Sequence, residues 1–440
     1  MPVFPSGFVW GAATAAYQIE GAVHEGGRGE SIWDRFCRQP GRISDGSSGE
    51  IACDHYRRYA EDIALMGDLG IGAYRFSIAW PRLFPAGKGP LNRQGLDFYD
   101  RLVDGLCEAG ITPFATLYHW DLPQELQARG GWTNRDTIPR FVDYACATAE
   151  RLGDRVQDFI LMNEISVVAW RGHATGIHAP GIAEARAFLV ATHHMNLAQG
   201  EAIRAMRGES SRWRLGSALS LMPIDPADDS MGAADAADLV DAFWNGSVID
   251  PLIHGSYPEI VAERFRSFVQ EGDMERIRQK VDFIGVNHYS RAYARQDSDQ
   301  PLGVGMVPPP DDRPVTAMGW RIDGDGFRET LLRLKEEYGN PPVYVTENGS
   351  AFNDIMDADG KVSDPARIAF LEEYLSALGQ ALEAGCDVRG YFVWSLMDNF
   401  EWAEGYSKRF GLVHVDYATQ KRTPKDSFGW YARLVREGRF

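Results

Sequence analysis

Eight short apolar runs recur along the chain, and longer amphipathic segments alternate with them. The runs span 8–13, 73–80, 111–120, 158–164, 214–220, 282–289, 342–348 and 389–398. Segments with helical periodicity span 54–69, 95–109, 137–152, 184–207, 325–338, 366–384 and 424–436. Apolar strands that alternate with helices are typical of a parallel sheet covered on its faces. Eight such units predict an α/β fold, a single-domain (β/α)₈ barrel over residues 1–440 with long loops at its C-terminal mouth.

Two stretches depart from this alternation. The region 233–265 has helical character, and we expect Pro251 and Pro258 to interrupt it. The longest irregular stretch, 290–320, contains the sequence VPPPDD, and we expect it to cap the mouth as a loop. No glycine-rich phosphate-binding motif follows any of the predicted strands, which argues against a nucleotide cofactor.

Composition excludes several classes of protein. The 45 basic and 62 acidic side chains give a net charge of −17, which disfavours binding to nucleic acid. No stretch approaches 18 apolar residues, so we expect no membrane span. The five cysteines are odd in number and show no C-x-x-C spacing, which favours a reducing compartment. The uncharged first 19 residues lack a basic region and contain Pro2 and Pro5, so we predict no signal peptide and a cytoplasmic protein.

Polar and aromatic residues stand at the ends of most predicted strands, where a barrel carries its functional groups. They are Arg75, His119, Asn163, Glu164, Asn287, Tyr289, Glu347, Asn348, Trp394, Glu401 and Trp402. Glu164 and Glu347 follow predicted strands four and seven, and a single glutamate in such a place is more often a solvated charge. Two carboxyl groups across one mouth can instead act as proton donor and nucleophile in glycosidic bond cleavage. Their polar and aromatic neighbours favour this second interpretation, and we expect the pKa of Glu164 to be raised.

Metal chemistry is not predicted. A histidine such as His119 is more often structural than a ligand, and the other histidines offer no chelating spacing. Tryptophans in predicted loops or at strand ends fit a sugar site better, because flat rings cover the apolar faces of sugars. These tryptophans are Trp33, Trp120, Trp170, Trp320, Trp394 and Trp402. We therefore expect a small-molecule partner and no cofactor.

The chain resembles glycoside hydrolase family 1, the β-glucosidase-type retaining barrels, over essentially its whole length. The motifs include FVWGAATAAYQIEGA, YRFSIAWPR, YHWDLPQ, VTENG, SLMDNFEWAEGYSKRFG and FGLVHVDY. The resemblance implies that Glu347 is the nucleophile and Glu164 the acid/base. It implies substrate-binding roles for Gln18, His119, Asn163, Tyr289, Trp394, Glu401, Trp402 and Phe410. It further implies supporting roles for Arg75 and Asn287, and an aglycone side lined by Trp170, His178 and Trp320.

Two positions depart from the family pattern. Ile165 replaces the proline that usually follows the acid/base, so the φ restraint of proline is absent. Arg171 places a cation where the family commonly has an apolar residue, and it either faces solvent or lines the aglycone side. Both changes bear on substrate preference more than on reaction type.

The resemblance implies a retaining exo-β-glycosidase, β-glucosidase foremost, that hydrolyses an unphosphorylated β-glycoside or short β-linked oligosaccharide. A 6-phospho-β-glycosidase and a transglycosylating enzyme remain alternatives with the same covalent intermediate. A non-enzymatic sugar-binding barrel would require loss of a carboxylate, and both glutamates are present. A metal-dependent isomerase would require a ligand cage that the sequence does not supply. Glucoside, galactoside and fucoside are not distinguished by these residues, because the epimers differ at one hydroxyl.

Overall fold

Eight parallel strands close into a barrel in the computed structural model, which describes residues 4–310 and 312–440. The order around the barrel is β1-β11-β10-β7-β5-β4-β3-β2, so the first and last barrel strands pair and close it. The strands are β1 (Val9–Ala13), β2 (Ala73–Ser77), β3 (Thr112–Tyr118), β4 (Asp158–Asn163), β5 (Arg214–Ser220), β7 (Phe283–Asn287), β10 (Val343–Asn348) and β11 (Val388–Trp394). All eight predicted strands and the (β/α)₈ fold class are confirmed.

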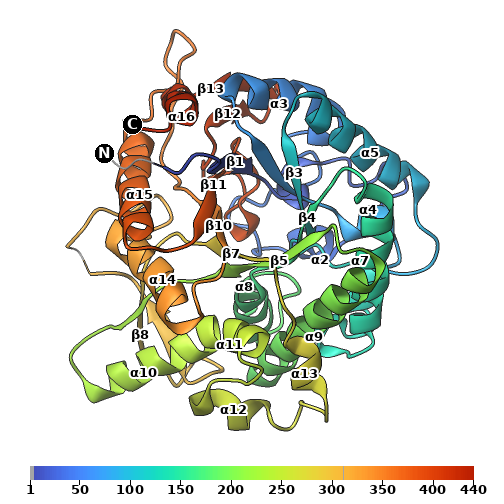
Figure 1. Ribbon diagram of the computed structural model, residues 1–440, viewed down its shortest axis with the longest axis vertical. Coiled ribbons are helices and arrows are strands. Elements are labelled where there is room, and N and C mark those ends of the chain that lie inside the picture. Colours follow the sequence, from blue (N-terminus) through green and yellow to red (C-terminus); the bar gives the residue numbers. More distant parts are fainter. Residues whose placement is uncertain (1–3, 311) are drawn as a thin grey trace.

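A ring of helices surrounds the barrel (Figure 1). The longer helices are α3 (His55–Leu69), α5 (Arg93–Glu108), α7 (Thr137–Leu152), α9 (Ala185–Glu209), α10 (Met231–Asp241), α14 (Gly324–Glu337), α15 (Pro365–Glu383) and α16 (Asp426–Glu437). Short helices and turns lie in the connections: α1 (Ala16–Ile19), α2 (Ile32–Cys37), α4 (Trp80–Leu83), α6 (Gln124–Gln127), η1 (Gly131–Thr133), α8 (Ile165–Ala169), η2 (Trp170–Ala174), η3 (Ala242–Gly246), α11 (Ser247–Ile253), α12 (Glu259–Phe265), α13 (Asp273–Ile277) and η4 (Trp402–Glu404). The longer helices cover the outside of the barrel sheet with their apolar faces, as the helical periodicity predicts.

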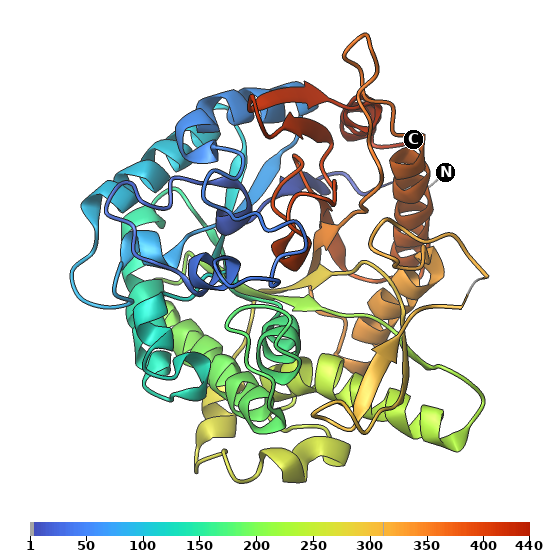
Figure 2. The same ribbon diagram turned by 180° about the vertical axis from the view of Figure 1, so that it is seen from behind.

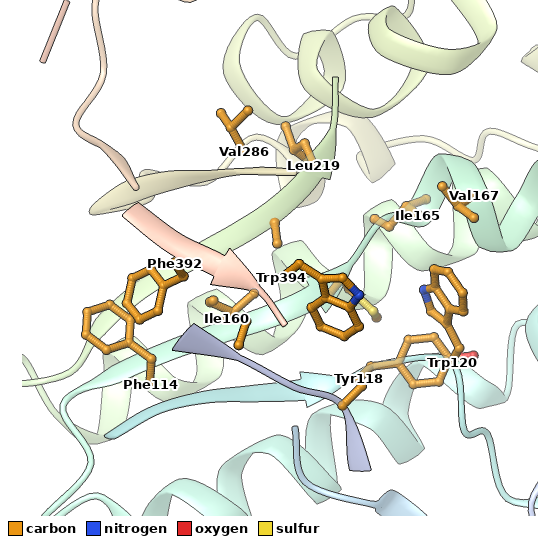
Figure 3. Close-up of a cluster of buried hydrophobic side chains, with 14 of the residues drawn as sticks. Phe114, Tyr118, Trp120, Ile160, Ile165, Val167, Leu219, Val286, Phe392 and Trp394 are labelled. Carbon is orange, nitrogen blue, oxygen red and sulfur yellow. The ribbon is translucent and has the colours of Figure 1, made fainter. Parts of the chain in front are cut away.

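Aromatic rings fill the barrel interior at the end opposite the mouth. Phe114 of β3 packs edge-on against Phe392 of β11, with ring centroids 5.0 Å apart (Figure 3). Gly11 of β1 leaves room for this pair, since a Cβ there would lie 2.4 Å from the Phe392 ring. Glycine is therefore required at this position by the close approach of a side chain. The interior is a packed core and not a pore.

The region 233–265 is interrupted differently from the expectation. The π-helical turn η3 separates α10 from α11, and Pro258 caps the start of α12. Pro251 lies inside α11 and does not break it. A proline leaves the carbonyl four residues earlier without its helical donor. The side chain of Asn196 donates to that carbonyl, Ser247 O, at 2.9 Å, so the helix continues.

The stretch 290–320 is only partly irregular, so the expectation of a plain loop is wrong. It contains the hairpin of β8 (Ala292–Gln296) and β9 (Val304–Val307), which joins β6 (Ile224–Pro226) in a three-stranded sheet. Asp311, part of the VPPPDD sequence, lies outside the described residues. A second small sheet is formed by β12 (Val413–Asp416) and β13 (Lys421–Pro424). Seen from behind, the loops after β1 and β11 and the α8 segment gather over one end of the barrel (Figure 2).

Candidate active site

The two glutamates lie at the C-terminal ends of β4 and β10, and both are buried. Glu164 directly follows β4 with a left-handed φ of 51°, and its backbone N–H donates to Ala218 O at 2.8 Å. Helix α8 begins at the next residue, Ile165, whose side chain is buried. Glu347 lies within β10. Positive φ is uncommon for non-glycine residues and marks positions that the surrounding structure holds in place.

The carboxyl group of Glu347 is held by two donors. Arg75 Nη1 donates to Oε1 at 2.5 Å, and the Tyr289 hydroxyl donates to Oε2 at 2.6 Å. An ionised carboxylate only accepts hydrogen bonds, so two donors on its two oxygens match that form. The structure thus brings Arg75 and Tyr289 into contact with Glu347.

Arg75 is also the centre of a buried hydrogen-bond network. Its Nη2 donates to Asn163 Oδ1 at 2.6 Å, and its Nε donates to Thr116 Oγ1 at 3.1 Å. Asn287 Nδ2 donates to the same Asn163 oxygen at 2.9 Å, and Thr346 Oγ1 donates to Asn287 Oδ1 at 2.7 Å. These contacts join β2, β3, β4, β7 and β10 and fix the orientation of the Arg75 guanidinium.

Glu164 is in a different environment from Glu347. Burial raises the pKa of its carboxyl to about 8, and the negative charge of Glu347 adds to the rise. The nearby Asn287 amide, Arg75 guanidinium and Ser220 hydroxyl favour the charged form and offset part of it. The expected direction of the Glu164 pKa is confirmed. Two carboxyl groups with unequal environments are the usual arrangement of an acid beside a charged partner.

One ring nitrogen of His119, Nδ1, takes no part in the hydrogen-bond network around Arg75. Asn163 gives its oxygen to Arg75, so its Nδ2 donates to His119 Nε2 at 3.1 Å. Burial, with the Arg75 charge, lowers the pKa of His119 well below its usual value, so the ring is neutral. The proton therefore lies on Nδ1, which is buried and has no partner among the described residues. A free N–H donor at the base of the mouth requires an acceptor.

Gln18 presents a second unpartnered atom. Its Nε2 donates to Asn399 Oδ1 at 2.9 Å and to Phe400 O at 2.8 Å, and it lies 3.4 Å from Glu401 Oε2. Its Oε1 is buried and has no partner within the described part of the chain. Burial and the charge of Glu347 raise the pKa of Glu401 to about 8. Gln18, Glu401 and His119 thus offer an acceptor, a carboxyl group and a donor.

Aromatic rings form one wall of the site. Trp402, with a left-handed φ of 48°, packs against Trp120 and Trp33 with ring centroids 4.5 and 4.6 Å apart. Trp394 stacks on His119 at 6.0 Å, His119 in turn lies 5.3 Å from Trp120, and Figure 3 shows Trp394 and Trp120 in the same cluster. Trp33 lies within α2 and Trp170 lies in η2, which continues α8, so the expectation that these two fall in loops or at strand ends is wrong.

The site opens into a cavity of about 700 Å³. Its inner part is lined by Glu164, Glu347, His119, Trp394, Glu401 and Trp402. Tyr289, which donates to Glu347, and Phe410, which packs against Tyr289, also line the cavity. Its outer part is lined by His178, Trp320, Met306, Pro308 and Pro309. The segment 290–320 therefore contributes to the rim of the mouth, as expected. Gln18, Asn163 and Arg75 are not among the lining residues and lie behind them.

Trp170 does not line this cavity, which corrects the expectation from the resemblance. Its ring packs against Phe188 of α9 and Trp244 of η3, at 5.9 and 6.0 Å. The physical reason is helical spacing: residues four apart share a face, so Val167 and Arg171 point to the cavity and Trp170 points away. Arg171 is consequently a cavity residue and not a solvent-exposed cation.

Sequence reasoning missed several lining residues. Ser220 ends β5 beside Glu164, and the strand-end argument that found the other polar residues could have found it. Trp244, Met222, Val167 and Ile177 line the outer cavity from loops and short helices. No local pattern distinguishes these four from core residues.

Neither a metal cluster nor a membrane-spanning helix is found. Over residues 4–310 and 312–440, no three His, Cys, Asp or Glu side chains converge as a metal site would require. The helices in the same residues are all too short or too polar to cross a bilayer. All five cysteines are free thiols.

The fold and site define a class: barrel hydrolases with a buried pair of carboxyl groups in an aromatic cavity. The family description "Glycosyl hydrolase family 1" matches residues 1–440, and the chain belongs to that family. It is 46% identical over 437 residues to β-glucosidase A of Thermotoga maritima, covering 98% of each chain. It is 44% identical to a bifunctional β-D-glucosidase/β-D-fucosidase of Bifidobacterium breve, again covering 98% of each. The structure of a Thermotoga maritima β-glucosidase in complex with glucoimidazole is similar, with a TM-score of 0.95, 45% identity and full coverage of both chains.

Proposed function

We propose that the protein is a retaining exo-β-glycosidase that removes terminal β-D-glucosyl residues. The observation that carries this proposal is the inequality of the two buried carboxyl groups. Glu347 is bound by Arg75 and Tyr289, whereas burial keeps a proton on Glu164. A proton donor and a charged nucleophile at one mouth are what double displacement at an anomeric carbon requires.

In the first step, a Glu347 oxygen attacks the anomeric carbon while the bond to the aglycone oxygen breaks. Glu164 gives its proton to that oxygen, and the aglycone leaves as an alcohol. The ester with Glu347 removes the negative charge that raises the pKa of Glu164. Glu164 can then take a proton from water, which attacks the anomeric carbon and releases Glu347. Two inversions give a product with retained configuration.

Two polar atoms without partners among the described residues, one on the cavity-lining His119 and one on Gln18 behind the lining residues, fit the hydroxyls of a terminal sugar. His119 Nδ1 would donate and Gln18 Oε1 would accept, beside the carboxyl of Glu401. Trp394 would lie against the sugar ring, Trp402 and Phe410 would border its hydroxyl arm, and Asn163 would act through His119. A ring so surrounded leaves room for extension only toward the mouth, which supports exo action. His178 and Trp320 would line the aglycone side.

An unphosphorylated sugar fits this site better than a 6-phosphate. A phosphate would meet the Glu401 carboxyl and would need a nearby cation. Neither downstream cation is free to provide it. Lys408 Nζ donates to Ala317 O at 2.8 Å, and Arg409 pairs with Asp398 at 2.6 Å. Phe410, the next residue, lines the cavity instead.

The glycone preference and the compartment are also proposals. We propose glucose as the preferred sugar because of the named β-glucosidase relative, with fucose the second candidate because of the bifunctional one. We propose cytoplasmic action on cellobiose-like substrates, supported by five free thiols. Transglycosylation would use the same intermediate, with a second sugar in place of water.

Leaving-group dependence tests the assignment of roles. Glu347→Ala should abolish turnover of every β-glucoside. Glu164→Ala should retain cleavage of 2,4-dinitrophenyl β-glucoside, whose leaving group needs no proton, and lose cleavage of phenyl or alkyl glucosides. Parallel loss of both classes in both variants would contradict the assignment. A panel of nitrophenyl β-glucoside, galactoside, fucoside and glucoside 6-phosphate gives the glycone preference in the same assay.

A further inference from the structure

Arg171 is a cation in the wall of the outer cavity. It lies in the π-helical turn η2, one turn after Val167, and its side chain lines the cavity. Within residues 4–310 and 312–440, no ion pair is found for its guanidinium, and no hydrogen bond is found from it. Two other arginines line the same cavity, and both are paired: Arg291 binds Asp323, and Arg321 binds Asp312. Arg171 differs from them in having no such acceptor.

The environment of Arg171 opposes its charge. Burial lowers the pKa of its guanidinium, and the carboxyl groups of Glu164, Glu401 and Glu404 oppose that effect from a distance. Arg171 in turn helps to lower the pKa of His178, which burial already lowers. An arginine stays charged in proteins and carries five N–H donors in a planar fork. Arg171 is half-buried, so its guanidinium is only partly hydrated, and a bound anion would supply the acceptor that it lacks among the described residues.

Apolar side chains surround the same part of the cavity. Val167, Ile177, Met222 and Trp244 all line it. Such a surface suits a flat aromatic ring, and the Arg171 fork suits a planar carboxylate on that ring. This combination of apolar side chains and one cation differs from the base of the cavity, where hydrogen-bond donors and acceptors lie together.

We propose that Arg171 makes the outer cavity selective for aromatic aglycones that carry a carboxylate. The proposal rests on the proposed β-glycosidase function and names the aglycone class for that same site. The acidic side chains nearby do not exclude such an aglycone. The charge of Glu347 is paired with Arg75, and Glu404 lies 3.9 Å from Lys408 Nζ. Glu164 and Glu401 both have raised pKa values, so their negative charge near neutral pH is reduced.

The test compares 4-carboxyphenyl β-glucoside with its carboxamide, 4-carbamoylphenyl β-glucoside. These substrates share the sugar and the ring and differ in the charge of one substituent. The wild-type enzyme should prefer the acid, and Arg171→Leu should lower the acid-to-amide ratio of kcat/KM by about tenfold or more. The change should lie mainly in KM for the acid. Arg171→Lys, which keeps the charge without the fork, should recover part of the preference.

Two controls separate selectivity from a structural role. Arg321→Gln, which removes an arginine already paired with Asp312, should leave the ratio unchanged. The acid-to-amide ratio is itself the second control, because any effect of Arg171→Leu on Glu164 or on the fold is common to the two substrates and cancels in the ratio. A wild-type preference for the amide, or an unchanged ratio in both Arg171→Leu and Arg171→Lys, would overturn the proposal. A wild-type enzyme inactive on 4-nitrophenyl β-glucoside would instead overturn the function on which the proposal rests.

Discussion

Arg75 is the residue that connects the two halves of the site. One nitrogen donates to Glu347, and another donates to Asn163, the residue directly before Glu164. The side chain is fully buried, so its charge is compensated only by these partners. Loss of Arg75 would disturb Glu347, the proposed nucleophile, and the orientation of His119 together. Variants at single contacts around it are therefore more informative than variants of Arg75 itself.

Tyr289→Phe removes one hydrogen bond to Glu347 and leaves the ring in place. The ring packs against Trp320 and Phe410, so the fold should be retained. A hydrogen bond to a charged group contributes about 1.5–3 kcal/mol, which corresponds to a fall in kcat/KM of about 10- to 100-fold. Steady-state kinetics on nitrophenyl β-glucoside would measure it. An unchanged kcat/KM would show that the Tyr289 hydroxyl does not assist the nucleophile.

The pKa of Glu164 predicts an alkaline limit to activity. Glu164 must be protonated in the free enzyme to assist the first step, and burial raises its pKa to about 8. The kcat/KM for an aryl glucoside that requires protonation should therefore fall as pH rises through about 8. A pH profile of kcat/KM, measured with a phenyl glucoside, provides the check. A profile that stays level to pH 10 would contradict the role of Glu164 as the acid.

The same pKa shift predicts a change in stability with pH. A carboxyl group whose folded-state pKa is raised stabilises the fold below its ordinary value of 4.5. That stabilisation of the fold is lost as pH rises through about 8, because the buried carboxyl group of Glu164 must then ionise in the folded state. Glu164→Gln should remove this loss, so its free energy of unfolding relative to wild type should increase between about pH 5 and 8. Chemical denaturation across that range would test the sign.

At the scale of elements, the barrel strands could be predicted because each lies in a continuous apolar run, and the longer helices because each is long enough to show its period. The eight apolar runs correspond to β1, β2, β3, β4, β5, β7, β10 and β11. The five strands of the two small sheets were missed, since strands such as β6 and β8 are partly exposed and do not form a continuous apolar run. The continuity of α11 was also missed, because Asn196, which replaces the donor that Pro251 lacks, is far away in sequence.

The residues of the candidate site could likewise be predicted only in part. Strand-end residues could be found because a parallel barrel gathers its strand ends at one mouth. The side of a helix that faces the cavity could not be found, because it depends on where α8 begins. The start at Ile165 turns Trp170 toward α9 and turns Arg171 toward the cavity. Membership of the family indicates the roles of the residues in the inner part of the cavity. Which residues line the outer part depends on tertiary packing.

A pair of variants on α8 and η2 tests this orientation. Trp170→Ala should lower the free energy of unfolding by about 3–5 kcal/mol, because it removes a buried ring from the contacts with Phe188 and Trp244. It should not change the order of preference among aryl aglycones. Val167→Phe should do the reverse, with little effect on stability and a higher KM for bulky aglycones. Thermal unfolding and a panel of aryl glucosides would show whether the two effects separate in this way.

For the whole molecule, the closing of the barrel depends on its C-terminal segment. The first strand, β1, pairs with β11 on one side and β2 on the other. Helix α16 covers β1, and the Tyr431 hydroxyl donates to Gly11 O at 2.9 Å. Helix α16 and β1 lie side by side although they come from opposite ends of the chain (Figure 1). We expect residues 1–440 to behave as one domain, so limited proteolysis should release no stable fragment.

Lys425 joins three distant segments through a buried charge network. Its Nζ donates to Asp354 at 2.5 Å and to Asp398 at 2.7 Å, and its side chain is fully buried. Asp398 also pairs with Arg409, directly before Phe410 of the cavity. Removing one member of a buried ion pair costs about 3–5 kcal/mol. Lys425→Ala should therefore lower the free energy of unfolding by about that amount in urea denaturation, and Lys421→Ala, an exposed control, should not.

The central claim is that Glu347 forms a covalent bond to the sugar. A 2-deoxy-2-fluoro β-glucoside with a dinitrophenyl leaving group should label it, because the fluorine slows both glycosylation and deglycosylation whereas the activated leaving group speeds glycosylation alone, so the covalent intermediate accumulates. Mass spectrometry of the intact protein and its peptides gives the direct measurement. We expect one sugar per chain, attached to the peptide that contains Glu347, and no adduct in Glu347→Ala. Turnover without an adduct, or an adduct on Glu164, would contradict it.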